Sequence, residues 1–239
     1  MSSHQRKPPT DELTALLEGH LEVEGRLPWS SNYTFLVSVN HKGVESQAIY
    51  KPEEGEQPLW DFPGGLYKRE VAAYELATAL GWPNIPATVV REEGPFGVGS
   101  LQHFVSADFE QHYFVLMEDE AMHEQLFAMA VFDVIANNTD RKGGHCLVDT
   151  DGTIWGIDHG VCFNAEPKLR TVIWDFEGHP ISAELLVDIA RVCEDIPHSL
   201  AVLLAPEEVI ALQDRMRGLL AHPFLPPLVS QRQYPYPLI

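Results

Sequence analysis

The sequence predicts an α+β protein with a small β-rich N-terminal part and a larger, mainly helical C-terminal part. Short runs of β-branched and aromatic residues, bounded by turn residues, are concentrated between residues 25 and 105. Beyond them, longer apolar stretches follow a helical spacing, and one Asp-Gly hairpin interrupts them. The chain has 239 residues, 45% of them hydrophobic, so it can bury one large core or two closely packed lobes.

The first element is expected to be a short amphipathic helix. Residues 1–9 are polar and contain prolines, and we predict that they are disordered. From Asp11 to Glu24, leucines at positions 13, 16, 17 and 21 follow a helical spacing. A turn over residues 26–32 separates this helix from the first strand.

Two strands, a helix and two further strands complete the β-rich part. A polar loop, Asn40-His41-Lys42-Gly43, joins the first two strands into a hairpin. Gly81 and Pro83 mark the end of the helix. The expected ranges are 33–39 and 44–51 for the hairpin, 67–80 for the helix, and 88–91 and 101–105 for the last strands.

The C-terminal part is predicted to contain helices around one central hairpin. The turn Asp149-Thr150-Asp151-Gly152 joins the two hairpin strands, 146–148 and 153–157. The tail from Pro223 is rich in proline, and we expect an irregular course packed by Phe224, Leu225, Tyr234 and Tyr236. Helices are expected over residues 120–137, 181–195 and 205–221.

Charge and cysteine content narrow the classes of function. The formal net charge is −19 and the basic residues form no long run, so nucleic-acid and anionic membrane partners are not expected. The cysteines, Cys146, Cys162 and Cys193, are widely spaced, which is typical of reduced core thiols in a cytosol. The sequence shows neither a secretory signal nor an apolar run of the ~20 residues that span a bilayer. We therefore expect a cytoplasmic protein without stable membrane association.

Two acids flank the central hairpin. Asp140 follows the long apolar helix, and Asp158 follows the second hairpin strand, so both carboxylates can face one point. Phosphoryl transfer needs such a pair, because one carboxylate orients the attacking hydroxyl and another holds magnesium. Asp-Gly hairpins are common, however, and acids often flank strands in solvated turns, so spacing alone also fits an ordinary surface hairpin.

A lysine and a glutamate in the β-rich part extend this hypothesis. Lys51 ends a strand and precedes Pro52, so its ammonium can point into a cleft and meet phosphate oxygens. Glu70 lies on the predicted helix, where it can hold that ammonium in place. The alternatives are a solvated strand end for Lys51 and a helix N-terminal acid favoured by the macrodipole for Glu70.

Three further features are open to two interpretations each. The backbone at Ser30 and Ser31 can offer N–H groups to a phosphate or form a plain turn. His145, after Gly143-Gly144, is a metal ligand or proton-transfer group, or else a hydrogen-bonded loop residue. Asp133 interrupts the apolar helix, and we expect a structural role, either exposed or with a buried partner.

Taken in order, these segments resemble the phosphatidylinositol 3-/4-kinase-like superfamily. Asn138-Thr139-Asp140-Arg141 and Ile157-Asp158-His159-Gly160 resemble its catalytic and metal-binding loops, most nearly those of type II phosphatidylinositol 4-kinases, which read Asn-Thr-Asp-Arg-Gly and Ile-Asp-Asn-Gly. Three more segments match the family in order. Ile49–Pro52 resembles the strand with the ATP lysine, and Glu70–Tyr74 resembles the helix with the acidic partner of that lysine. Gly99–Val105 resembles the hinge. The likeness spans roughly residues 28–165. The whole chain also resembles small actinobacterial kinase-like proteins, and more distantly HipA-type kinases.

The resemblance implies a bilobal protein-kinase-like fold that binds ATP and magnesium in its cleft. It implies one domain with an N-lobe over residues 10–105 and a C-lobe over 106–239. It also implies a role for each matching residue. Lys51 would contact the ATP phosphates and Glu70 would position Lys51, while Asp158 would be the principal magnesium ligand. The adenine site would be lined by Gln102, Phe104 and Val105. Asp140 would be the catalytic acid/base, and Arg141 would bridge Asp140 to the metal loop.

The sequence departs from the family pattern in three respects. By spacing, His145 stands where the family has an asparagine as second metal ligand, and magnesium prefers oxygen ligands. The phosphate loop lacks glycine, and no Walker-type motif is present. The segment 164–180 carries only Lys168 and Arg170 as strong bases, fewer than an anionic inositol lipid would require.

We therefore expect an ATP- and magnesium-dependent kinase that acts on a hydroxyl of a protein or a small soluble molecule. Two alternatives stay open. The first is a nucleotide-binding pseudokinase that serves as a regulatory module, which His145 motivates. The second is a phosphatidylinositol kinase. A structural protein without a ligand would leave the ordered matches unexplained.

Overall fold

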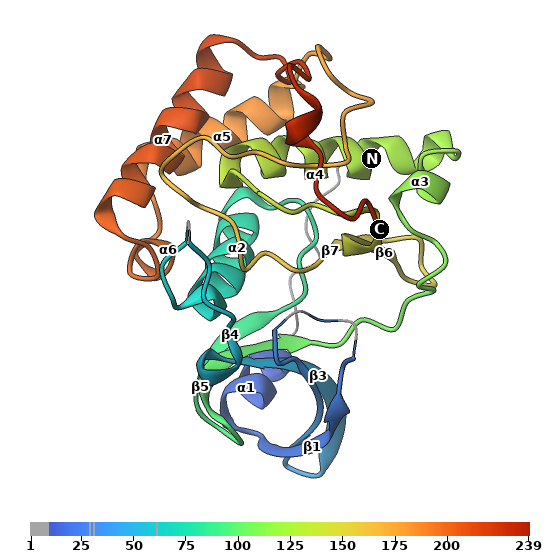
Figure 1. Ribbon diagram of the computed structural model, residues 1–239, viewed down its shortest axis with the longest axis vertical. Helices are drawn as coiled ribbons and strands as arrows, with labels where there is room; N and C mark the ends of the chain where they lie inside the picture. The colour runs from blue at the N-terminus through green and yellow to red at the C-terminus, as the bar shows by residue number, and fades with distance from the viewer. Residues whose placement is uncertain (1–9, 29, 31, 61) are drawn as a thin grey trace.

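The computed structural model describes residues 10–28, 30, 32–60 and 62–239. They form a small N-terminal lobe built around a sheet, at the bottom of Figure 1, and a larger helical lobe above it. The predicted disorder of residues 1–9 lies outside the described residues.

An antiparallel five-stranded sheet builds the N-terminal lobe, with the strand order β1-β2-β3-β5-β4. The inward-facing side chains of its strands form one core with Leu16 of helix α1 (Thr10–Glu18); they include Val37, Val39, Ala48, Tyr50 and Leu101. The strands are β1 (His20–Arg26), β2 (Phe35–His41), β3 (Val44–Pro52), β4 (Thr88–Gly94) and β5 (Gly97–His103).

The first helix is shorter than the sequence predicts. It ends at Glu18 instead of Glu24, and the following residues form β1, which pairs antiparallel with β2. Gly19 permits the close approach of the chain at this break, because a Cβ there would lie 2.5 Å from the Ala15 carbonyl oxygen and 2.6 Å from Val39 Cγ1. As a result, the segment 27–34 joins two paired strands.

Helix α2 (Leu66–Leu80) connects the two lobes. Arg69 on this helix donates a hydrogen bond to the Cys162 carbonyl oxygen (2.7 Å) and pairs with Glu208 of α7 (Pro206–Ala221). Both partners of this ion pair are buried, so α2 is fixed against the C-terminal lobe.

The C-terminal part is mainly helical, as predicted. Within α4 (His123–Ala136), Met129 and Phe132 are completely buried, so the helix forms the centre of the lobe. The remaining elements of the described residues are the helices α3 (Tyr113–Leu116), α5 (Ala183–Glu194) and α6 (His198–Ala201), the 3₁₀ turn η1 (Glu53–Gly55) between β3 and α2, and the 3₁₀ turns η2 (Glu120–Met122), η3 (Gly143–His145) and η4 (Gln231–Gln233).

The predicted central hairpin is confirmed. Strands β6 (Cys146–Val148) and β7 (Ile154–Gly156) pair antiparallel. The Asp149 carboxylate stabilises their turn by accepting the N–H groups of Asp151 and Thr153, both at 2.9 Å.

The chain after α7 crosses the C-terminal lobe and ends beside the β6–β7 hairpin (Figure 1). Leu225 is buried as predicted, and its N–H donates to the His179 carbonyl oxygen (3.1 Å). Phe224 and Tyr236 are 53% and 95% exposed, so the expectation that they pack the tail is wrong. Backbone hydrogen bonds hold much of this segment in place of apolar burial.

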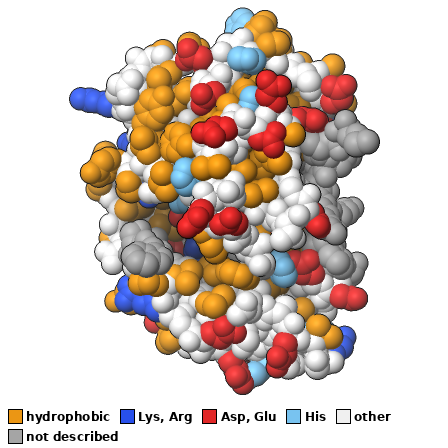
Figure 2. Space-filling view, turned by 90° about the vertical axis from the view of Figure 1, so that its right-hand side faces the viewer, with side chains coloured by type: hydrophobic (Ala, Val, Ile, Leu, Met, Phe, Trp, Pro, Cys, Tyr) orange, Lys and Arg blue, Asp and Glu red, His pale blue; other side chains and the backbone are white. Residues whose placement is uncertain are grey.

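The surface carries scattered acidic groups. On the face shown in Figure 2, Asp and Glu side chains are spread between hydrophobic ones, and Lys and Arg form no broad patch. No helix among the described residues combines the length and the apolar character that a membrane span requires.

Candidate active site

Lys51, at the end of β3, meets two carboxylates from distant parts of the chain. Its Nζ contacts Glu70 Oε1 on α2 and lies 2.8 Å from Asp158 Oδ1, just after β7. Burial lowers the pKa of Lys51, but Asp158 and Glu70 raise it more, so the pKa lies above its ordinary value. The amine is therefore held as a cation at a point where three segments of the chain converge.

Glu70 connects the lysine to the loop that contains Asp158. Its second oxygen, Oε2, accepts the N–H of His159 at 2.9 Å. The Glu70 side chain is only 3% exposed, whereas that of Lys51 is 22% exposed and that of Asp158 is 48% exposed. The glutamate thus forms the closed end of the cluster, and Asp158 forms its open end.

Asp158 sits in a strained backbone conformation and stays ionised. Its φ is +60°, in the left-handed region that aspartate tolerates better than most residues. The nearby Lys51 ammonium holds the pKa of Asp158 well below its ordinary value, although burial opposes this. Its other oxygen, Oδ2, lies 3.3 Å from His145 Nε2.

The hydrogen bonds of His145 fix the position of its proton. The backbone N–H of Lys142 donates to Nδ1 (3.4 Å), so the proton of the neutral ring is on Nε2, which faces Asp158. Burial lowers the pKa of His145 to about 4, and Asp158 opposes that shift. In this arrangement the Nε2–H group faces the Asp158 carboxylate and has no lone pair to offer a metal there.

Asp140 faces the same region from the loop after α4. Its backbone N–H donates to Asn138 Oδ1 (3.0 Å), and its carboxylate lies 3.1 Å from Lys142 Nζ. Burial raises the pKa of Asp140, Lys142 lowers it, and Asp158 is close enough to raise it again. The two acids are therefore close enough to act on one another electrostatically.

Arg141 does not reach the cleft. Its side chain is completely buried and binds the Asp133 carboxylate through Nε and Nη2, at 2.9–3.1 Å. Its other donors reach the carbonyl oxygens of Ile157 (3.0 Å) and His145 (3.3 Å), and Nη2 lies 2.7 Å from His159 Nε2. Arg141 therefore bridges the loops of Asp140 and Asp158 from within the core, where its guanidinium is closed to solvent.

The carboxylate of Asp133 organises the loop that carries Asp140. It accepts hydrogen bonds from Asn138 Nδ2 (3.0 Å) and Thr171 Oγ1 (3.1 Å) in addition to Arg141. Asp133 and Asn138 are both completely buried. The structure therefore supports the second interpretation of Asp133, in which the acid is paired with a buried partner.

The candidate adenine-site residues lie on and after β5. Gln102 pairs with Ile49 across the sheet and therefore shares a sheet face with Lys51, two positions further along β3. Its Nε2 is already used in a hydrogen bond to Thr88 Oγ1 (2.9 Å). Phe104 and Val105 lie after the end of the strand and are half-buried. The Phe104 N–H donates to the backbone carbonyl oxygen of Gln47 (3.0 Å).

The candidate phosphate loop lies between β1 and β2. Within it, Ser30 Oγ and Thr34 Oγ1 are 2.8 Å apart, and the Leu27 N–H donates to the Thr34 carbonyl oxygen (2.8 Å). Ser31 lies outside the described residues. The sequence placed this segment after a helix, so its position between two paired strands comes only from the structure.

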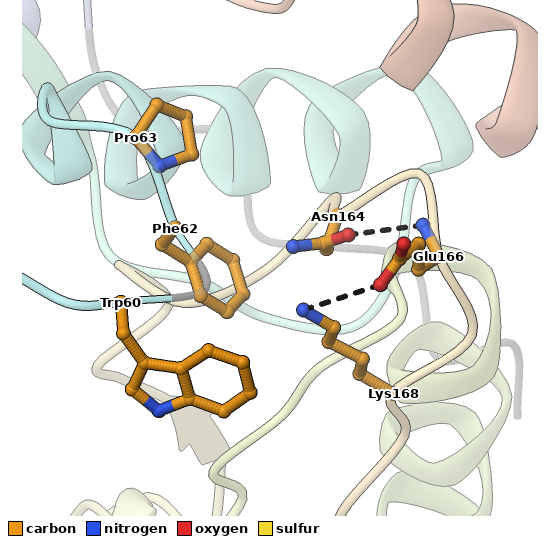
Figure 3. A pocket seen from close by; sticks show the side chains of 6 residues that line it. All are labelled: Trp60, Phe62, Pro63, Asn164, Glu166 and Lys168. Atoms are coloured by element: carbon orange, nitrogen blue, oxygen red, sulfur yellow. Dashed lines mark hydrogen bonds and ion pairs between the residues drawn. The ribbon is translucent and has the colours of Figure 1, made fainter.

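A cavity of about 620 Å³ lies beside the segment that follows Asp158 (Figure 3). Asn137, at the end of α4, fixes this segment by donating to the Asn164 and Glu166 carbonyl oxygens at 2.8 and 2.7 Å. An aromatic wall faces charged and amide groups across the cavity. Its lining residues are Trp60, Phe62, Pro63, Asn164, Glu166 and Lys168.

The donor set around Asp158 fits magnesium only in the company of a nucleotide. Within the described residues, no group of three or more His, Cys, Asp or Glu side chains could hold a metal. Magnesium often takes one or two carboxylates and completes its shell with substrate phosphates and water. Asp158 can supply that carboxylate, whereas His145, with its proton on Nε2, does not suit the ion.

Sequence patterns missed several residues of this site. Lys142, which contacts Asp140, and the Asn138–Asp133 pair depend on how the loop folds back onto α4. The only local signal was an acid inside an apolar helix, because such an acid requires a buried partner.

Comparison with known proteins identifies the family and the fold of the chain. Protein Rv2133c of Mycobacterium tuberculosis is 37% identical over 268 aligned residues, covering 95% of this chain and 95% of that protein. The crystal structure of the Helicobacter pylori proinflammatory kinase CtkA matches with a TM-score of 0.50 and 11% identity, over 88% of this chain and 94% of that chain. This likeness confirms the predicted bilobal kinase-like fold. The family profile for phosphatidylinositol 3- and 4-kinase matches residues 69–199, which include Glu70, Asp140 and Asp158.

That profile covers more than half of the chain. The chain therefore belongs to the phosphatidylinositol 3- and 4-kinase family.

Proposed function

We propose that this protein is an ATP- and magnesium-dependent phosphotransferase that acts on a hydroxyl of a protein or a small soluble molecule. The observation that carries the proposal is the convergence of Lys51, Glu70 and Asp158 beside Asp140. A strand lysine paired with a helix glutamate, next to an acid for metal and an acid for the acceptor, is the arrangement that phosphoryl transfer requires.

Each residue has a distinct part in the proposed reaction. Lys51 binds oxygens of the ATP phosphates, and Glu70 keeps its ammonium in place. Asp140 accepts a hydrogen bond from the acceptor hydroxyl and orients its oxygen toward the γ-phosphorus. The new P–O bond forms as the bond to the β-phosphate oxygen breaks, ADP leaves, and the hydroxyl proton passes to Asp140.

Asp158 is the proposed protein ligand of magnesium. When bound with ATP, the ion neutralises the phosphate oxygens. His145 orients the Asp158 carboxylate through Nε2, and the buried Arg141 keeps the two acid-bearing loops in register.

A soluble acceptor is favoured over an anionic lipid. In the segment 164–180, Lys168 and Arg170 are the only Lys or Arg residues, and Lys168 Nζ lies 3.6 Å from the Glu166 carboxylate. The cavity of Figure 3 combines aromatic walls with mixed charge, which does not favour a polyanionic head group.

The test is transfer of labelled γ-phosphate, with ADP formation measured on the same sample. Asp140→Asn should lower turnover about a thousandfold, the range of a lost general base, without lowering the melting temperature. Asp151→Asn, in the exposed turn of the hairpin, is the matched control and should behave as wild type. Turnover at the wild-type rate in Asp140→Asn would show that Asp140 is not the general base. Phosphate appearing only in phosphatidylinositol vesicles would replace the soluble acceptor with a lipid.

The second candidate is a nucleotide-binding pseudokinase, and His145 favours it. The ring supplies a proton where the family has an asparagine oxygen, so one magnesium ligand is missing. His145→Asn distinguishes the two candidates. A gain of turnover in the variant supports a site that has lost activity, whereas a loss shows that His145 serves transfer.

A further inference from the structure

The end of the chain contacts the loop that carries Asp140. We call residues 233–239 the C-terminal strap; it runs across the lobe to the β6–β7 hairpin (Figure 1). The Leu238 carbonyl oxygen accepts the N–H of Gly143 at 2.7 Å. Gly143 directly follows Lys142, the partner of Asp140, and begins the turn that ends at His145. The strap therefore binds the backbone between two groups that touch the site acids.

The strap also contacts the segment on the other side of this loop. The Gln233 carbonyl oxygen accepts the N–H of the buried Thr171 at 3.0 Å. Thr171 pairs with Arg141 in a parallel bridge, and the Val172 N–H donates to the Arg141 carbonyl oxygen at 3.0 Å. The same short strap thus satisfies backbone donors on both sides of the Arg141–Thr171 bridge.

The glycine pair Gly143-Gly144 lies against the end of the strap. A Cβ at Gly143 would lie 3.1 Å from Phe114 Cε2 and 3.4 Å from the Leu238 carbonyl oxygen, which is tight. Ile239 Cγ2 would lie 3.9 Å from a Cβ at Gly144. The tightest of these contacts is with the Phe114 ring, and an added Cβ would meet the strap only at ordinary van der Waals distance.

We propose that the C-terminal strap is a positioning element for phosphoryl transfer, and that the Leu238 carbonyl holds the loop from Asp140 to His145 in its working geometry. This inference rests on the proposed function, because it takes that loop to be the catalytic one. Among the described residues, the strap makes no hydrogen bond or ion pair with Lys51 or Glu70. Its loss should therefore lower kcat and leave the KM for ATP nearly unchanged.

Two shortened chains test the carbonyl itself. A chain ending at Leu238 loses Ile239 but keeps an acceptor oxygen at position 238, whereas a chain ending at Pro237 loses that acceptor. The longer chain should retain the turnover of the full chain. The shorter one should lose about fivefold in kcat, the effect of one hydrogen bond of ordinary strength, with hydrogen exchange of the amides at 142–145 clearly faster.

A second pair of variants removes the donor instead of the acceptor. Gly143→Pro and Gly143→Ala both add a Cβ, but only proline loses the N–H. Lys142 has φ −88° and ψ 163°, which suits a residue before proline, and the first position of a helical turn tolerates proline. Gly143→Pro should reproduce the kcat loss, and Gly143→Ala should keep most of the activity.

The two proposals fail in different ways. If the full chain shows no transfer to any acceptor, the proposed function fails, and the exchange rates at 142–145 still report whether the strap orders the loop. Equal exchange rates and equal kcat in the chains ending at Leu238 and Pro237 would overturn the strap proposal, even if the full chain is an active kinase.

Discussion

Two charged clusters meet at the β6–β7 hairpin, and they differ in their access to solvent. Arg141 and Asp133 are completely buried, and the arginine is surrounded by acceptors. Lys51 and Asp158 form an open cluster whose side chains are 22% and 48% exposed. A closed ion pair can only hold the protein together, whereas an open one can exchange its partners for a ligand.

Each of the two loops that contain the acids supplies one residue to the cleft and one to the buried core. In Asp140-Arg141 and in Asp158-His159, the first residue faces the cleft and the second is completely buried. The buried members touch each other, because Arg141 Nη2 lies 2.7 Å from His159 Nε2. Each proposed reactive carboxylate is thus followed directly by its anchor, which explains how two loops can hold their acids in one place.

The largest effect should come from breaking the closed cluster. Asp133→Ala leaves the Arg141 charge buried without its partner, and we expect a loss of about 3–5 kcal/mol in the free energy of unfolding, measured with urea. Asp214→Ala, which breaks the exposed Asp214–Arg217 pair on α7, is the control and should cost no more than about 1 kcal/mol. If Asp133→Ala and Asp214→Ala lower the free energy of unfolding equally, the buried Arg141–Asp133 cluster does not stabilise the fold more than an exposed ion pair does.

His145 lies between the clusters and gives a pH-dependent contribution to stability. Its pKa is about 4 in the folded protein and about 6.5 in an unfolded chain. Between these values the unfolded chain binds more protons, so stability should fall as pH decreases from 6.5 to 4, by at most about 3 kcal/mol. Above pH 6.5 this contribution should be constant.

Unfolding of the nucleotide-free protein at pH 7 and pH 5 tests this contribution. His145→Asn should lose less stability between the two values than wild type does. His20→Asn, at a side chain that is 74% exposed, is the control. An unchanged difference in His145→Asn would show that the ring is not held neutral by the fold.

The smallest effect should come from loosening the open cluster. In Glu70→Gln, Lys51 keeps Asp158 but loses a charged partner, and the remaining amide oxygen can still accept the His159 N–H. We expect the KM for ATP to rise about tenfold in steady-state kinetics, because a hydrogen bond to a charged group contributes about 1.5–3 kcal/mol. Glu75→Gln, on the same helix and bound to Ser199, should leave the KM unchanged.

The sequence predicted the elements around the open cluster because each has a local signal. Lys51 ends an alternating strand, and Asp140 and Asp158 flank a hairpin with an Asp-Gly turn. The closed cluster gave no such signal, since the partners of Asp133 come from residues 138, 141 and 171 only after folding. Its one trace was an acid within an apolar helix.

Strand β1 shows why the N-terminal lobe was harder to predict. Its residues, HLEVEGR, are mostly exposed, so only Leu21 and Val23 could mark an alternation, and Leu21 also continued the leucine spacing of the helix. The break at Gly19 depends on contact with Val39 of a neighbouring strand. The contact between the strap and Gly143 is of the same kind, because it joins residues far apart in the chain.

The most direct test of the account is calorimetric binding of ATP, with and without magnesium, to wild type, Asp158→Ala and Asp140→Asn. If the open cluster is the nucleotide site, wild type and Asp140→Asn should bind ATP with magnesium, and Asp158→Ala should lose the magnesium-dependent part. Turnover should then remain only in wild type. Magnesium-dependent binding that survives in Asp158→Ala would contradict the account, because the metal and the nucleotide would then be held elsewhere.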